Sequence, residues 1–476
     1  MDKIFSQNKY TSFIKSIFNL GKTIFIMVLV VMPLSLNYAQ SNVNTNMQNP
    51  TLLMLLKLAL KNSPGLSNVR YSIQSSKEKL LAAEYLRIPK IQFSGDGFYS
   101  PILEMRLIPG VRLGAGKPDG LSMNEIFNDK IIELSPTLSL PIYTGGEISG
   151  KVNAAEANSQ ISNTRYILTR DHLLLSITAQ YFNLLKIRQA IKATNASIKA
   201  LIKSRKFKQE QVRYGKALPV DLYRIDTRLS ELQVGLLEEK NHYKTSIDNL
   251  SALVGTTLPG NLQPADTLAY KYIPLSIEDS TKILKNSPFN QLSLFGLKYA
   301  EAQKTLQQSG LLPKINLIAK YSFYWGNNAV NSPNYNNNNK DFIAILQIRF
   351  PIFNFQIYKK IEAASYSALA SSERMRQTEY NVKRDFHLAL FNEQTAEKSI
   401  KVAENSIRTA KEAFRIQQER YNVGKITVDN LIDAEAGLLK ARLKYINSVT
   451  NYYLSIIQVL RIKGNISLND LAVFTK

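Results

Sequence analysis

The sequence predicts a mostly α-helical protein built from two structural repeats, each of which combines a β-hairpin with long antiparallel helices. Three observations predict this fold class. A motif that ends in Arg-Tyr and leads into a glycine occurs twice, at 207–215 and 414–424. Leu-Lys-Asn-Ser-Pro motifs begin at Leu60 and Leu284, and both are followed by Pro-Lys-Ile at the same spacing. Proline is absent from two long stretches, so each stretch predicts one uninterrupted helix.

The N-terminus has the order of segments that is typical of a secretory signal peptide. Lysines up to Lys22 precede an apolar run at 23–32, and Ala39 offers a small residue for cleavage. We expect residues 1–39 to be a signal peptide; the alternative is an uncleaved anchor helix, and both imply export. No later run reaches the roughly 18 apolar residues of a membrane-spanning helix.

Composition excludes several function classes. Cysteine is absent, which excludes disulfides, thiolate metal sites and a cysteine nucleophile. The net charge of +23 indicates a generally basic surface, and export argues against a nucleic-acid partner. His172, His242 and His387 stand singly, without metal-ligand spacing, and no phosphate-binding loop or nucleophile elbow is present. We expect no enzymatic activity, no cofactor and no metal.

The two repeats are expected at 40–260 and 261–476, with a proline-containing linker at 258–274. Each repeat opens with a helix that a proline starts, at 64–87 and at 288–311. These helices lead into the β-hairpins.

After each Pro-Lys-Ile the hydrophobic period changes to two, which predicts β-hairpins at 89–142 and 313–352. In the last strand the alternate positions from Phe342 to Ile352 are apolar, while Gln347 and Arg349 lie on the opposite face. Aromatic residues gather near the strand ends, as in a membrane β-barrel; they are Phe98, Tyr99, Tyr143, Tyr324, Trp325, Phe350 and Phe353. The alternative is a soluble sheet packed on the helices.

Four strands would leave two open edges. Unpaired backbone groups in hydrocarbon cost several kcal/mol each, so we expect several chains to close one barrel. The connections 104–128 and 326–340 are expected to be solvated loops outside the barrel.

The proline-free stretches 146–213 and 354–422 predict long helices, and their heptad spacing, as in the series from Ile400 to Tyr421, calls for lateral helix partners. The tips of the two helical hairpins are expected at 213–220 and 420–428. Shorter return helices follow, so the segment 62–86 and its copy are expected to complete the partner column.

This duplicated order of helix, Pro-Lys-Ile, strand hairpin, long helix, Arg-Tyr with a nearby glycine, and return helix resembles the TolC-like outer-membrane efflux protein family over residues 50–470. The resemblance implies a homotrimer in a Gram-negative outer membrane, with a twelve-stranded β-barrel in contact with outer-membrane lipids and an α-helical barrel across the periplasm. It also implies a periplasmic adaptor protein as a partner and, through the adaptor, an inner-membrane pump.

The resemblance implies two groups of functional residues at the tips. The expected adaptor contacts are Gly215, Lys216, Val423, Gly424 and Lys425. The expected pore gate consists of Tyr214, Asp221, Asp226, Tyr421, Asp429 and Asp433. Ile426 departs from the family pattern, because an arginine can stand there. The alternative for the acidic residues is an ordinary helix start, where carboxylates favour the positive end of the helix dipole.

The predicted function is passive conduction of drugs, metabolites or proteins through an outer-membrane channel of a tripartite efflux pump or a type I secretion system. The alternative is a periplasmic coiled-coil adaptor or scaffold. An adaptor would carry lipoyl-like domains rather than long strands with aromatic ends.

Overall fold

The computed structural model describes residues 49–99, 130–274, 280–326 and 340–474. The predicted signal peptide and the loop 104–128 lie outside these residues, as does nearly all of the loop 326–340. In the described part of the chain, no helix combines the length and the apolar character needed to cross a membrane.

Four strands form one antiparallel sheet in the order β1-β2-β3-β4. They are β1 (Lys90–Tyr99), β2 (Lys130–Tyr143), β3 (Lys314–Gly326) and β4 (Lys340–Arg349). The two predicted hairpins are therefore joined into one sheet, with Leu138 of β2 opposite Ala319 of β3. The expected continuation of the last strand to Ile352 is wrong: β4 ends at Arg349, just before Pro351, which has no N–H to donate to a strand neighbour.

The two faces of the sheet differ in polarity. On one face, the Ser94 and Ser135 hydroxyls lie 2.9 Å apart, and the Glu133 carboxylate pairs with Lys320 at 2.7 Å. The opposite face carries exposed apolar side chains, among them Ile91 and Ile348, with 76% and 63% of their surface exposed. The predicted alternation of faces is thus present in the strands.

The two long helices are confirmed. They are α4 (Glu147–Arg213, 67 residues) and α8 (Phe355–Asn422, 68 residues), each about 100 Å long at 1.5 Å per residue. Gly150 near the start of α4 lets another helix approach closely, because a Cβ there would lie 3.1 Å from the Leu306 backbone. Leu306 belongs to α7 (Pro288–Gln308).

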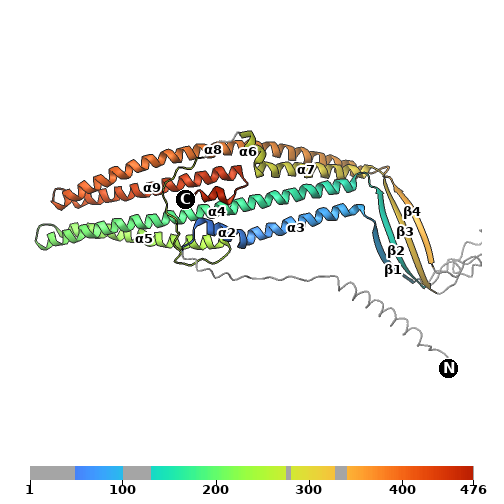
Figure 1. The fold of residues 1–476 in the computed structure, drawn as a ribbon, viewed down its shortest axis with the longest axis horizontal. Coiled ribbons are helices and arrows are strands. Elements are labelled where there is room, and N and C mark those ends of the chain that lie inside the picture. The colour runs from blue at the N-terminus through green and yellow to red at the C-terminus, as the bar shows by residue number, and fades with distance from the viewer. Residues whose placement is uncertain (1–48, 100–129, 275–279, 327–339, 475–476) are drawn as a thin grey trace, which may run out of the picture. The chain divides into compact units, whose positions relative to one another are not determined.

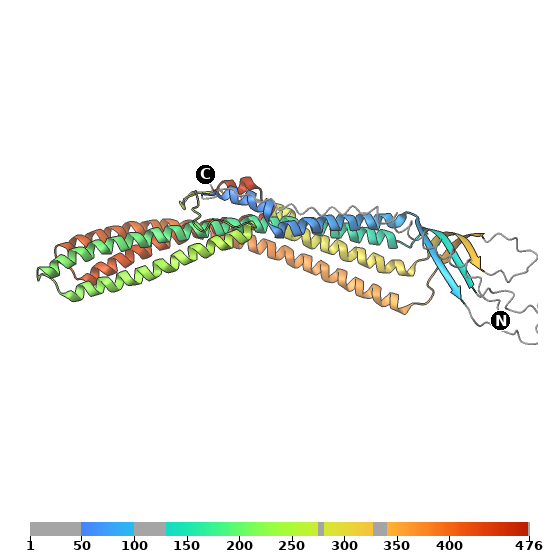
Figure 2. The same cartoon turned by 90° about the horizontal axis from the view of Figure 1, so that it is seen from below.

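Shorter helices complete the columns, as predicted. Along α4 lie α3 (Pro64–Glu84) and α5 (Pro219–Val254), and along α8 lie α7 and α9 (Val428–Lys463). Since α4 also packs against α7 and α9, the helices follow the order α3/α5, α4, α7/α9, α8. Figures 1 and 2 show that this order matches the order of the strands, β1 to β4, to which they connect.

The junctions between stacked helices require glycine. Gly255 ends α5 and Gly464 ends α9, both with positive φ (77° and 68°). A Cβ on Gly255 would lie 2.7 Å from the carbonyl oxygen of Asn62, and one on Gly464 would lie 2.5 Å from Cγ of Pro288. In both repeats the end of the return helix therefore meets the segment that starts the helix leading to the sheet.

The linker between the repeats is fastened by tyrosine hydroxyls. Tyr243 donates to the carbonyl oxygen of Leu262 at 2.8 Å, and Tyr453 donates to that of Ala269 at 2.6 Å. The linker packs near α2 (Leu52–Asn62), whose first N–H donates to Asp266. The helix α6 (Ser280–Asn286) follows the linker and packs against α7, α8 and α9.

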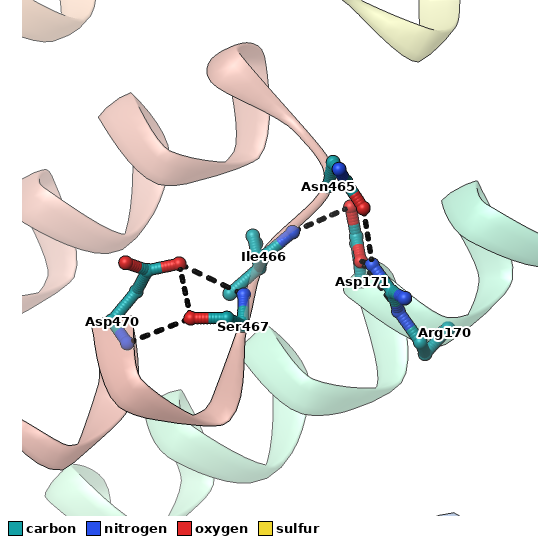
Figure 3. A network of polar contacts seen from close by, with 6 residues as sticks. All are labelled: Arg170, Asp171, Asn465, Ile466, Ser467 and Asp470. Atoms are coloured by element: carbon teal, nitrogen blue, oxygen red, sulfur yellow. Dashed lines mark hydrogen bonds and ion pairs between the residues drawn. The ribbon is translucent and has the colours of Figure 1, made fainter.

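The C-terminal segment is tied to the middle of α4 (Figure 3). The Asp171 carboxylate accepts a hydrogen bond from the Ile466 N–H at 3.3 Å, and Arg170 donates to Asn465 at 3.2 Å. A capping box of Ser467 and Asp470 then starts α10 (Leu468–Ala472). These contacts fix the C-terminal end of the second repeat at mid-height of the long helices.

Candidate functional site

Two helical hairpins end at the same end of the molecule, opposite the strands (Figure 1). The first turn connects α4 to α5 and the second connects α8 to α9. Gly215 and Gly424 adopt positive φ (66° and 72°), and a Cβ on either would have no heavy atom within 4 Å. The N–H groups of Lys216 and Lys425 close the ends of the long helices by bonding the carbonyl oxygens five residues earlier, at 2.8 and 2.9 Å. The tips are therefore built alike.

All five predicted adaptor contacts lie on these turns and are exposed: Gly215, Lys216, Val423, Gly424 and Lys425. Val423 exposes 68% of its surface, which is a large fraction for an apolar side chain. Exposed backbone and one apolar side chain suit contact with another protein. The adaptor role of these residues stays a prediction.

The two tyrosines of the predicted gate occupy opposite environments. Tyr214 exposes 69% of its surface, whereas Tyr421 is fully buried. The Tyr421 ring lies 6.5 Å from that of Phe207, and Lys208 Nζ lies 4.6 Å from its centre. Among the described residues its hydroxyl has no hydrogen-bond partner. Burial raises the pKa of that hydroxyl. In this conformation Tyr421 is a packing residue between α4 and α8.

Two predicted gate carboxylates pair within the first hairpin. Asp221 lies 3.5 Å from Lys208 Nζ, and Asp226 accepts two hydrogen bonds from the Arg205 guanidinium, at 2.5 and 3.1 Å. These bonds hold the pKa of Asp226 below its usual value. Both pairs join α4 to α5 and so fix the first hairpin.

Other pairs join the two hairpins to each other. Arg224 of α5 pairs with Asp429 of α9, and Arg228 pairs with Glu435 at 3.2 Å. Glu435 is 2% exposed, and no group in the described part of the chain donates a hydrogen bond to its Oε1 atom. We name these two pairs the inter-hairpin links. In contrast, Asp433 is exposed and has no ion-pair partner within the described ranges.

The sequence prediction missed Arg224, Arg228 and Glu435. The only available signal was the spacing of Arg224 and Arg228, which places them on one face of a helix. The arrangement offers reversible ion pairs and packing contacts. Within the ranges that the structure covers, no three His, Asp or Glu side chains are grouped so that they could hold a metal ion.

Comparison with known proteins identifies a matching family and several relatives. A family model described as outer membrane efflux protein matches residues 55–256 and 281–465. The cobalt-zinc-cadmium resistance protein CzcC of Cupriavidus metallidurans is 22% identical over 69% of this chain and 76% of its own length. The outer membrane protein TolC of Escherichia coli is 20% identical over 88% of this chain and 87% of its own.

Solved structures share the fold. The outer-membrane channel OprN superposes with a TM-score of 0.76 at 16% identity, covering 88% of this chain and 91% of OprN. The outer membrane protein VceC of Vibrio cholerae gives a TM-score of 0.73 at 16% identity, covering 87% of this chain and 97% of VceC.

Proposed function

The chain belongs to the outer membrane efflux protein family, and we propose that it works as a trimer, as the exit channel of a tripartite efflux pump or a type I secretion system. It is an outer-membrane efflux channel that extends into the periplasm, and it is not an enzyme. The adaptor alternative is not supported, because the family match covers both repeats, including the strands.

The observation that best supports the trimer is a row of exposed apolar side chains on α8. These residues recur at steps of eleven and expose between 56% and 62% of their surface: Tyr358, Leu369, Tyr380, Phe391 and Val402. Eleven residues make three helical turns, so the side chains stand above one another along the helix. Burying each one fully would contribute about 1.5 to 3 kcal/mol. This row needs a partner helix.

The other edge of the protomer supplies a partner. Here α3 and α5 expose large apolar side chains, such as Tyr71 at 72% and Leu237 at 66%. The sheet also has one open edge on each side of the protomer, since β1 and β4 are its outer strands. A copy-to-copy contact that joins α8 and β4 to α3 and β1 closes a ring, as head-to-tail interfaces do when the rotation closes.

Three copies bring twelve strands, enough to remove every open edge in the membrane. The apolar face of the sheet then contacts lipid and the polar face lines the channel. The domain organisation follows: residues 1–39 direct export, and the repeats 40–260 and 261–476 each supply one hairpin to the barrel and one hairpin tip to the periplasmic end.

The tips contact a periplasmic adaptor through Gly215, Lys216, Val423, Gly424 and Lys425, and the adaptor connects the channel to an inner-membrane pump. The gate residues act at this end, where the inter-hairpin links hold α5 and α9 together. Adaptor binding opens the channel only to the extent that the adaptor binds the open state more tightly. Because CzcC is described as a cobalt-zinc-cadmium resistance protein, divalent cations join drugs, metabolites and proteins among the candidate cargo.

Disulfide cross-linking tests the trimer directly, because the chain has no cysteine. Leu369 lies 14 residues after the start of α8 and Tyr71 lies 13 before the end of α3, so both stand about 20 Å from the strands. We expect the Leu369→Cys/Tyr71→Cys variant to give covalent dimers and trimers on oxidation. The control Leu369→Cys/Leu66→Cys, with a buried partner position, should stay monomeric on a denaturing gel. Cross-linking only within single chains, or a monomer in detergent, would contradict the proposal.

A further inference from the structure

One face of α9 presents a polar stripe that leads from the tip half of the helix to its end. The residues of the stripe are exposed and follow one another at steps of three, four or seven, so they share one face of the helix. The step of seven passes Leu454, which is half-buried. We name this set the α9 stripe, and its members are Lys440, Lys444, Asn447, Asn451, Gln458 and Arg461.

A hollow of about 620 Å³ lies against the first half of the α9 stripe. Its lining includes four stripe residues, from Lys440 to Asn451, and Arg228 of α5. This volume is in the range of sites that hold a small molecule. We name it the α5–α9 hollow.

The α9 stripe faces away from the linker between the repeats. Figure 2 shows α2 and α10 on one side of the layer of long helices. On that side Leu268 of the linker lines a different hollow together with Arg442 of α9. Arg442 is two residues from both Lys440 and Lys444, which is about 200° around a helix. The α5–α9 hollow therefore opens on the opposite side of the layer.

The ring of three copies decides which side is the interior. If the linker side faced inward, the linker, α2 and α10 of all three copies would occupy the channel. The linker side is therefore the outer side, and the α9 stripe faces the water inside the helical barrel. The polar composition of the stripe agrees with this position.

The two lysines of the hollow are not neutralised. No ion pair in the described part of the chain involves Lys440 or Lys444, and from Lys440 to Arg461 the stripe contains no acidic residue. Arg228, in contrast, pairs with Glu435 at 3.2 Å and with Glu231 at 3.0 Å. In the trimer, two lysines from each of three copies lie at one level of the channel. Rings of Lys or Arg favour the passage of anions.

We propose that the α5–α9 hollow is a transit site for small organic anions, with Lys440 and Lys444 binding their carboxylates; this inference rests on the proposed function and narrows its cargo. The two lysines are one helical turn apart, about 6 Å along the axis, so two carboxylates of one small molecule can reach both. Asn447 and Asn451 add amide N–H donors to the same hollow. Cations, including divalent metal ions, are repelled at this level of the channel.

Reconstitution of the purified protein in a planar lipid bilayer tests the proposal. Under a gradient of KCl, the reversal potential gives the ratio of chloride to potassium permeability. The parent should favour chloride, and Lys440→Glu/Lys444→Glu should lower the ratio about threefold or more. Succinate, a small dicarboxylate, should reduce the chloride current of the parent at millimolar concentration and leave that of the lysine variant unchanged.

The matched control is Lys411→Glu/Arg442→Glu, which makes the same charge change in a hollow on the linker side of the layer. The permeability ratio should stay within about 1.5-fold of the parent value, because the layer of helices separates these residues from the ions in the channel and salt screens the remaining interaction. A trimer band on a gel shows that each variant folds.

Several results would overturn the inference and leave the proposed function intact. They are a parent channel that favours potassium, an unchanged ratio in the lysine variant, an equal shift in both variants, and a block by succinate that persists without the lysines. If the parent gives no channel current at all, the proposed function itself fails.

Discussion

The glycine at the end of α9 allows a quantitative test of the junction between stacked helices. In Gly464→Ala the new Cβ would meet the Pro288 ring, with Cγ at 2.5 Å, while the backbone keeps a φ of 68°. A positive φ costs a residue with a Cβ about 1 to 2 kcal/mol. Overpacking against a rigid ring adds about 1 to 3 kcal/mol. We expect a total loss of about 2 to 5 kcal/mol.

The matched control is Gly424→Ala, because Gly424 has a similar φ of 72° but open space around it. In this variant only the cost of the positive φ remains, about 1 to 2 kcal/mol. With an unfolding entropy of roughly 2.1 cal/mol/K per residue, a chain of this length loses about 1 °C of melting temperature per kcal/mol. Gly464→Ala should therefore melt about 2 to 5 °C lower than the parent and Gly424→Ala about 1 to 2 °C lower.

The assay is thermal unfolding of the detergent-solubilised protein, followed by circular dichroism at a helical wavelength. Pro288→Ala in the Gly464→Ala background should recover part of the loss, because the two sites are in contact. Equal melting of Gly464→Ala and Gly424→Ala would refute the reasoning. So would a double variant whose loss equals the sum of the two single losses.

Three further predictions concern the two helical hairpins. Tyr421→Phe removes a buried hydroxyl that has no partner among the residues the structure covers, so melting should be unchanged or higher. Tyr421→Ala should cost about 3 to 5 kcal/mol. A large loss for the Phe variant would contradict the packing role. Because the Arg205 bonds lower the pKa of Asp226 in the folded state, this carboxylate stabilises the fold at pH values above its unfolded pKa of about 3.9, and the contribution is lost as pH falls through the lower folded value. Melting temperature should then fall more steeply on acidification in the parent than in Asp226→Asn; parallel curves would show that the pair adds nothing. Arg228→Ala leaves the buried Glu435 unpaired and should cost about 3 to 5 kcal/mol, most of which Glu435→Gln in the same chain should restore, as measured by the same unfolding assay.

The local elements could be predicted from the sequence because their ends carry strong signals. Pro141 and Pro351 precede the long helices, and the tip glycines follow them, so the observed limits differ from the predicted ones by about one residue. The strand alternation also fixed which side chains share a face. The exception, the extra length given to β4, came from counting alternation across a proline.

Tertiary pairings could not be predicted in the same way. Nothing in the local pattern indicates that β2 pairs with β3, or that Arg224 and Arg228 reach α9. Tyr421 is instructive, because two arguments conflicted. The heptad series that starts at Ile400 placed it on the packed face of α8, while the family resemblance placed it at the gate. Its burial agrees with the heptad argument.

The interruptions at Gly255 and Gly464 divide the molecule mechanically. The rods α4 and α8 run unbroken from the strands to the tips, whereas α5 and α9 end at mid-height, each against the segment that starts another helix. A displacement of α5 or α9 at the periplasmic end therefore meets one of these helix ends before it can reach the membrane. In the proposed trimer, the barrel would therefore stay rigid while the far end changes its aperture.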